Sequence, residues 1–261
     1  MVGFIGSLIG LGGAATLIPI LVLIGVPVKE AIASAMVVII ATSSGSAASY
    51  VKQRIANIKV AMFLEMFTII GAIAGATITT IINPVFLYFF FAAFLMTSFL
   101  RFIKRRPVIL QPQDRVSRWL GLSGSYYDES LKQQVSYQAN HAILGGLGML
   151  VAGLAAGMLG IGAGAFKVTV QENVLRLPPK VASTTSNFII GMTALAGLSV
   201  YLASGLMNLT LMAPMAIGAT IGAVIGGRIL NRLNNRLLTV LFFAVVVYLI
   251  IQMLYKGVTA L

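Results

Sequence analysis

Two glycine clusters are the first residues whose types and spacing point to chemistry. The chain reads GSLIGLGGAATLIP from Gly6 to Pro19 and GMLGIGAGAFKVT from Gly157 to Thr169, both inside long apolar segments. Irregular backbone survives in lipid only where it is buried or lines a wet cavity. A half-helix that begins after such a break presents free N–H groups and the positive end of its dipole, which suit an anion. The predicted anion site includes Gly12, Gly13, Gly162 and Gly164.

Close helix packing is the alternative explanation for glycine in a membrane helix. It suits Gly71 with Gly75, and Gly222 with Gly226, because each pair is four residues apart on an uninterrupted apolar segment. We favour the binding site for the denser clusters and packing for these pairs.

Hydroxyl and amide side chains form a second group, on the apolar segments 30–51 and 181–203. Neutral donors suit a dehydrated oxyanion, because they bind it without holding it by a full charge. The alternative for each side chain is a bond to its own helix or to a neighbouring helix. The predicted binding residues of this group are Ser34, Thr42, Thr185, Ser186 and Asn187.

Two charges stand inside apolar segments. Glu65 lies beyond Lys59, and an acid within the membrane is by default a candidate for ion coupling. It could equally pair with Arg54 or Lys59 near the interface. Lys167 directly follows the second glycine cluster and could attract an anion, or else pair with Glu172 as a structural contact.

The elements that must position these residues are membrane helices. Of the 261 residues 59% are hydrophobic and 9% charged, and the mean hydropathy is +0.99. A soluble domain carries about 25% charged residues, so the composition indicates an integral membrane protein. Apolar runs of about 20 residues indicate helical spans. The net charge of +12 fits basic cytoplasmic loops better than nucleic acid, which we do not expect as a partner.

Several function classes are excluded by composition. The chain has no cysteine and one histidine, His141, which argues against a metal site built on these ligands. No GxxxxGK[ST] motif is present, and neither a Ser–His pair nor a carboxylate dyad is placed for catalysis. We therefore expect neither an enzyme nor a cofactor.

Hydropathy divides the chain into two membrane parts and a loop. The first repeat covers 1–103, a basic polar loop covers 104–140, and the second repeat covers 141–261. Short basic loops stay in the cytoplasm, so we expect 104–140 on that side. The apolar segments are expected at 2–24, 30–51, 60–82, 84–103, 142–171, 181–203, 208–230 and 236–255.

The two parts repeat one another. An offset of 151 residues places Pro27 on Pro178 and Tyr50 on Tyr201, and an offset of 150 relates the glycine clusters. In each pair of equivalent loops one loop is basic and the other is uncharged. Because basic loops stay in the cytoplasm, the two loops of a pair should lie on opposite sides of the membrane, so the repeats are predicted to be inverted. Four plain spans per half would give parallel repeats, so the segment 142–171 must enter and return as a broken hairpin. By symmetry the segment 2–24 should do the same.

These motifs resemble the TauE/SafE sulfite-exporter-like membrane transporters. Each half of that family opens with a glycine cluster and a proline, followed by a small-residue turn with proline and a Thr-Ser pair. This chain reads GLGGAATLIP (10–19) and GVPVKEAIASA (25–35), then GMLGIGAGAF (157–166) and LPPKVASTTSNF (177–188). The loop GSYYD (124–128) is also similar. The resemblance implies secondary transport of anions such as sulfite, sulfonates or sulfoacetate.

Departures from the family pattern affect the site. Ala14 and Ala163 interrupt what is often a run of three glycines, and Thr169 stands in place of the second proline. Lys167 adds a charge, and Ser34 with the alanine after it replaces the first Thr-Ser pair. Symmetry between the two halves of the site is therefore not assumed.

The sequence predicts an all-α polytopic membrane protein with two inverted repeats of about four spans each. We expect a secondary transporter that moves a small anion across the inner membrane by alternating access, coupled to a proton or sodium ion. The alternatives are an anion channel and a non-transporting subunit of a membrane complex. Assembly as a homo-oligomer is left open.

Overall fold

The computed structural model describes residues 14–52, 55–103, 113–128, 132–206, 212–221, 247–248 and 250–259. Its elements are α2 (Ala14–Leu23), α3 (Val28–Lys52), α4 (Ile58–Ile81), α5 (Pro84–Ile103), α6 (Arg115–Trp119), β1 (Gly124–Asp128), β2 (Gln133–Tyr137), α7 (Ala142–Leu159), α8 (Gly164–Asn173) and α9 (Pro179–Ala203). A further apolar helix covers Met212–Ile221. The predicted glycines Gly12 and Gly13 lie outside the described residues.

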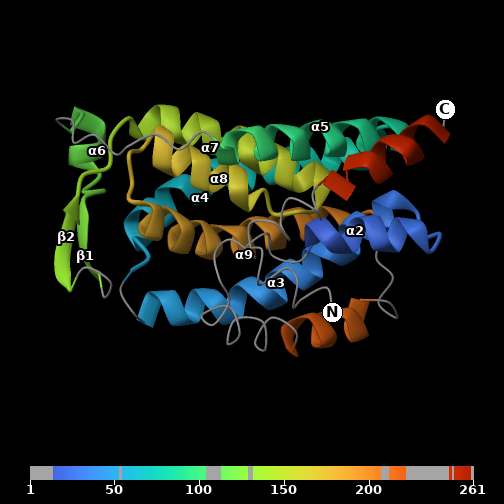
Figure 1. Ribbon diagram of the computed structural model, residues 1–261, viewed down its shortest axis with the longest axis horizontal. Coiled ribbons are helices and arrows are strands. Elements are labelled where there is room, and N and C mark those ends of the chain that lie inside the picture. Colours follow the sequence, from blue (N-terminus) through green and yellow to red (C-terminus); the bar gives the residue numbers. More distant parts are fainter. Residues whose placement is uncertain are drawn as a thin grey trace.

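The long helices lie side by side, and the strands β1 and β2 stand at one end of the bundle (Figure 1). We call this the hairpin end. The α4 helix begins there because the Asn57 side chain caps it, accepting from the Val60 N–H at 3.1 Å. The Asn57 amide also donates to the Tyr137 hydroxyl at 2.9 Å and to the Leu122 carbonyl at 3.2 Å. One side chain therefore fixes where α4 starts relative to β2.

Helix α4 packs along α7, and both run away from the hairpin end. A Cβ at Gly71 would meet the Leu150 carbonyl, and one at Gly153 would meet the Thr68 carbonyl. Only glycine lets the two backbones approach this closely. The structure thus confirms the packing interpretation of Gly71, and Gly75 makes a similar contact with Leu154.

Helix α9 runs parallel to α4 and antiparallel to α3. The Asn57 N–H donates to the Thr185 hydroxyl at 3.1 Å, and Thr193, two turns further along α9, reaches Glu65 on α4. Against α3 the order is reversed, since Gly197 lies on Met36 and Gly191 on Ser43. At the opposite end of the bundle Lys29 donates to the Thr80 carbonyl at 2.9 Å, which joins the start of α3 to the end of α4.

Three of the described helices are long and apolar enough to cross a membrane: α4, α7 and α9. The 24 residues of α4 extend about 36 Å at 1.5 Å per residue, more than the ~30 Å of a hydrocarbon core. Large apolar side chains such as Met66 and Ile70 on α4, and Leu144 and Val151 on α7, are exposed. In water such faces would be an aggregation hazard, whereas lipid covers them at no cost. The chain is a helical membrane protein.

The loop between the two membrane parts contains the one departure from an all-α fold within the described residues. The strands β1 and β2 pair antiparallel, with Gly124 opposite Tyr137 and Asp128 opposite Gln133. Tyr126 is 7% exposed and packs on the Tyr137 ring at 6.4 Å between centroids. Alternation along the strand therefore turns Tyr126 inward and Tyr127 outward.

Two helix ends that lie within the described residues follow the sequence offsets. The end of α8 lies 150 residues after that of α2 (23 and 173). The start of α9 lies 151 residues after that of α3 (28 and 179). In both places a short helix is thus followed by a long one after a similar interval.

Candidate functional site

The predicted break in the fifth apolar segment lies between α7 and α8. Helix α7 ends at Leu159, and three of the next four residues adopt the left-handed region: Gly160 at φ 62°, Gly162 at φ 70° and Ala163 at φ 48°. Glycine reaches this region freely, while alanine pays about 1 kcal/mol or more for it. A Cβ at Gly162 would come 2.9 Å from the Ile190 side chain, so both conformation and space require glycine there.

After the break the chain returns toward its starting end. Val170 packs on Gly148, Leu175 packs on Gly145, and the Asn140 N–H donates to the Leu175 carbonyl at 2.9 Å. These contacts make α7 and α8 an antiparallel hairpin with both outer ends at the hairpin end. Within the described residues, the apolar segment 142–171 is thus broken into two antiparallel helices, the arrangement that the sequence analysis expected of it.

The start of α8 lies against the middle of α9. The Ser186 hydroxyl is 3.4 Å from the Gly164 carbonyl, to which it donates, and Gly162 lies against Ile190. No described side chain caps α8, whose N-cap is Ala163. An uncapped helix start in buried surroundings offers N–H groups and a partial positive charge to an anion. The structure thus brings Gly162, Gly164 and Ser186 together.

Lys167, in the first turn of α8, connects this region to Glu65. The lysine is fully buried and its Nζ donates to the Thr193 hydroxyl at 2.7 Å. That hydroxyl lies 3.1 Å from Oε1 of Glu65, which is 4% exposed. Three helices therefore hold an ammonium and a carboxylate with one hydroxyl between them. A buried charge without its partner is strongly destabilising, so each group depends on the other.

Among the described residues Glu65 and Lys167 meet at Thr193, while Arg54, one of the partners considered for Glu65, lies outside the described residues. Lys59 is exposed at the start of α4, and Glu65 lies within the bundle and reaches Thr193 instead. Lys167 reaches the same hydroxyl on α9. His141, the N-cap of α7, is exposed.

Gln171 is a buried polar residue that the sequence prediction missed. It is one helical turn after Lys167 and fully buried, and neither its amide oxygen nor its amide nitrogen has a partner among the described residues. Buried polar groups nearly always have partners, so an orphaned amide marks a place where a polar molecule could be bound. The signal in the sequence that could have found Gln171 is its position four residues after Lys167, because residues four apart lie on the same face of a helix.

The other predicted residues do not join this group by any described contact. Thr185 accepts from the Asn57 N–H near the hairpin end, and Asn187 donates to the Ser183 carbonyl of its own helix at 3.2 Å. Thr42 donates to the Val38 carbonyl at 2.9 Å. Ser34 is buried on α3. Thr42 and Asn187 thus bond to their own helices and Thr185 bonds to the start of α4, which are the two alternatives that hydroxyl and amide groups have in membrane helices.

No group of three or more His, Cys, Asp or Glu gathers to hold a metal in the part of the chain that the structure describes. Outside the membrane part, burial raises the pKa of the Tyr137 phenol, so this hydroxyl stays neutral as the partner of Asn57.

Comparison with known proteins agrees with this picture. Residues 1–253 match the sulfite exporter TauE/SafE family. The chain is 28% identical over 217 residues to a probable membrane transporter protein, YunE, of Bacillus subtilis (strain 168), covering 79% of this chain and 76% of that protein. No solved structure matches the chain. The match over residues 1–253 shows that the chain belongs to the sulfite exporter TauE/SafE family of membrane proteins.

Proposed function

We propose that the protein is a secondary transporter that binds a small anion at the start of α8. The observation that carries this proposal is the uncapped α8 terminus beside Ser186, with the buried Lys167 in its first turn. Helix ends at broken segments near the middle of a bundle are where transporters hold their substrates. The unpartnered amide of Gln171 offers the anion further hydrogen bonds along the same helix face.

The two halves, 1–103 and 141–261, are proposed to be inverted repeats that rock about this site. The matching start positions of α3 and α9 support a repeat, and the antiparallel contact between these equivalent helices supports inversion. A two-fold axis in the membrane plane makes equivalent helices antiparallel wherever they pack on each other. The basic loop 104–140 would then face the cytoplasm, with the protein in the inner membrane.

The substrate class is proposed from the family. A TauE/SafE member is expected to carry a sulfur-containing anion such as sulfite, a sulfonate or sulfoacetate. A thermal-shift screen of the purified protein with sulfite, sulfate, sulfoacetate, taurine and thiosulfate tests this, because a ligand that binds the folded state raises the melting temperature by mass action. A flat response to all five anions would refute the binding site.

A matched pair of glycine variants tests where the anion binds. Gly162→Ala places a Cβ against Ile190 and forces a left-handed alanine, so anion binding should be lost. Gly205→Ala forces the same left-handed conformation at φ 71° in open space after α9, and anion binding should persist. Equal binding in the two variants would move the site away from α8.

The rival functions predict different measurements. A channel would pass the anion in proteoliposomes at a rate that no ion gradient changes. A non-transporting subunit would show no anion-dependent stabilisation and would need a partner for stability. Saturable flux driven by an ion gradient supports the transporter over both.

A further inference from the structure

Resting on the proposed function, we infer that Glu65 is the proton-binding site that couples transport. A proton on Glu65 and an anion on Lys167 occupy the protein together and move in the same direction. The inference comes from one arrangement: a buried lysine whose counter-charge is a buried carboxylate, at the helix end where the anion is proposed to bind.

Charge balance is the first step. In the described structure the ammonium of Lys167 and the carboxylate of Glu65 neutralise each other through Thr193. An anion arriving at the start of α8 would add a net negative charge to a buried site, which is costly in low-dielectric surroundings. A proton taken from solution by Glu65 removes that excess. For a monovalent anion the loaded site then carries the same net charge as the empty one.

Thr193 can serve both states because its hydroxyl has two acceptors within reach. Oε1 of Glu65 lies at 3.1 Å and the Ile189 carbonyl at 2.8 Å from its oxygen. A hydroxyl has one proton to donate and can accept from other donors. With ionised Glu65 it donates to the carboxylate; with protonated Glu65 it accepts from the acid and turns its own proton to Ile189. Lys167 is then free to pair with the anion.

A sodium ion does not fit the same position. The Lys167 ammonium donates to the Thr193 oxygen at 2.7 Å and so occupies the place of a cation beside Glu65. A second cation there would face the repulsion of a like charge within a few ångströms. A proton avoids this conflict, because it joins the carboxylate covalently and removes a negative charge without adding a separate ion.

Among the described residues, Lys167 is the charged group that reaches Glu65 through the Thr193 hydroxyl, and Glu172 on α8 is a half-buried acid five residues further along the same helix. Helix α7, packed along α4, has no titratable side chain. On α9, Lys180 is exposed in the first turn, while the Tyr201 hydroxyl donates to the Gly157 carbonyl. On α3, Lys29 is bonded to Thr80 at the far end of α4. Proton uptake by Glu65 should therefore depend on whether Lys167 is paired with an anion.

The first test uses the unaltered protein. Methanesulfonate is a suitable probe, or thiosulfate should that bind more tightly, because neither takes up a proton near neutral pH. Mixing the anion with protein in weakly buffered solution, followed with a pH indicator, should show uptake of about one proton per anion bound. Where Glu65 is ionised in the empty protein, anion affinity should fall about tenfold for each unit of pH increase. Binding with no proton uptake at any pH would overturn the inference.

The second test compares two carboxylate variants. Glu65→Gln resembles the protonated acid and leaves Lys167 without its counter-charge, so the anion should bind with an affinity that no longer depends on pH. Glu30→Gln changes a carboxylate in the first turn of α3, outside this group, and should keep the proton uptake of the unaltered protein. If Glu65→Gln retained the same proton uptake, Glu65 would not be the site.

A final comparison separates this inference from the function on which it rests. In proteoliposomes, replacing sodium by potassium should leave anion flux unchanged, whereas an anion gradient should drive protons in the same direction. Sodium-dependent flux would overturn proton coupling and leave the anion site standing. Absence of any anion binding to the unaltered protein would refute the proposed function itself.

Discussion

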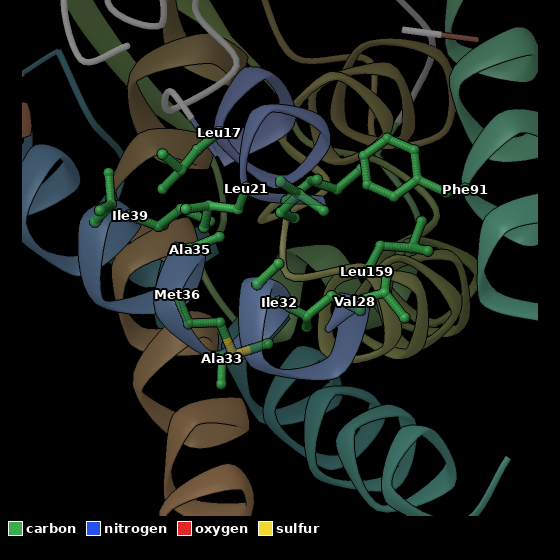
Figure 2. Close-up of a cluster of buried hydrophobic side chains, with 14 of the residues drawn as sticks. Leu17, Leu21, Val28, Ile32, Ala33, Ala35, Met36, Ile39, Phe91 and Leu159 are labelled. Carbon is green, nitrogen blue, oxygen red and sulfur yellow. The ribbon is translucent and has the colours of Figure 1, made fainter. Parts of the chain in front are cut away.

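Helices α2 and α8 end at equivalent positions and have opposite chemistry. The 150-residue offset places Leu17 on Lys167 and Leu21 on Gln171. The two leucines are buried in the hydrophobic cluster around α3, where Figure 2 shows them near Ala35 and Ile39. Their counterparts are fully buried polar groups, one tied to Thr193 and one without a described partner.

This difference shows that a short helix can occur at both positions without carrying the same buried polar side chains. Each of α2 and α8 is a short helix that follows a glycine-rich stretch of the sequence. Of the two, only α8 bonds, among the described residues, to the hydroxyl that contacts the buried carboxylate of Glu65. Leucine packing gives α2 its stability through burial alone. The α8 helix gives up part of that stability to keep a charge and an amide inside the bundle.

Lys167→Leu should have the largest effect, because it gives α8 the side chain that α2 has. Glu65 is then buried without its counter-charge, and the free energy of unfolding should fall by about 3–5 kcal/mol, together with loss of anion binding. Denaturant unfolding in detergent measures this change. The double variant Lys167→Leu with Glu65→Gln should recover most of the stability while anion binding stays lost. A fully stable single variant would show that the pair contributes nothing.

Leu21→Gln makes the reverse change in α2. It removes buried hydrocarbon and leaves an amide in an apolar cluster, so stability should fall by about 3 kcal/mol. The same unfolding measurement applies, and Leu21→Met, which keeps the volume, is the control. Full tolerance of glutamine would indicate that α2 also faces a polar cavity, and the contrast between the halves would fail.

Gln171→Leu should act in the opposite sense on stability. Without anion, replacing an unpartnered buried amide by leucine should raise the free energy of unfolding by about 1 kcal/mol. Anion affinity should fall about tenfold if the amide binds the substrate, since one charge-assisted bond is worth about 1.5 kcal/mol. Titration calorimetry and unfolding measure the two effects. A loss of stability on substitution would mean that Gln171 has a structural partner.

The smallest effect is expected at the hairpin end, which belongs to neither half. Asp114 accepts from the His141 N–H at 2.8 Å and from Ser117 in α6. Its partial burial acts to raise its pKa, but hydrogen bonds from Ser117 and the His141 N–H outweigh this and hold the pKa below its usual range. Asp114→Ala should cost about 1 kcal/mol near neutral pH, as for other lost helix caps.

The pH dependence of that variant has a definite sign. A carboxyl whose pKa is lowered by folding stabilises above its unfolded value, about 3.9, and stops doing so as the pH falls through the lower folded value. The difference between Asp114→Ala and the unaltered protein should therefore be constant near neutral pH and disappear in acid. Hydrogen exchange of the His141 backbone N–H measures this difference in stability, and Gln113→Ala is the control variant. Reduced anion binding in Asp114→Ala would mean that the loop acts on the site.

Much of the helical arrangement could be predicted from local patterns. The apolar segments 30–51, 60–82 and 84–103 correspond closely to α3, α4 and α5. The break in segment 142–171 was predicted from its glycine cluster and from the charges of the loops, and in the structure Gly160 and Gly162 adopt the left-handed region there. The strands β1 and β2 were missed because they are short and polar, and their pairing is fixed by Tyr126 and Tyr137 packing together.

The site was predicted less completely. Gly162, Gly164 and Ser186 gather at the break, whereas Thr185 and Asn187 are bonded elsewhere because neighbouring residues on a helix face different sides. Thr193 was not predicted to be the link between the two charges. Its role depends on the side chains from α4 and α8 meeting at one hydroxyl of α9, which no local pattern records.

The sequence by itself determined that this is a membrane protein with a repeated pattern, a glycine break and two isolated charges. Those features depend on composition and on the conformational freedom of single residues. Only the tertiary structure decided that Glu65 and Lys167 share one hydroxyl and that Gln171 is buried without a described partner. The physical reason is that side-chain partners across helices are set by how closely the backbones approach, here through glycine contacts between α4 and α7.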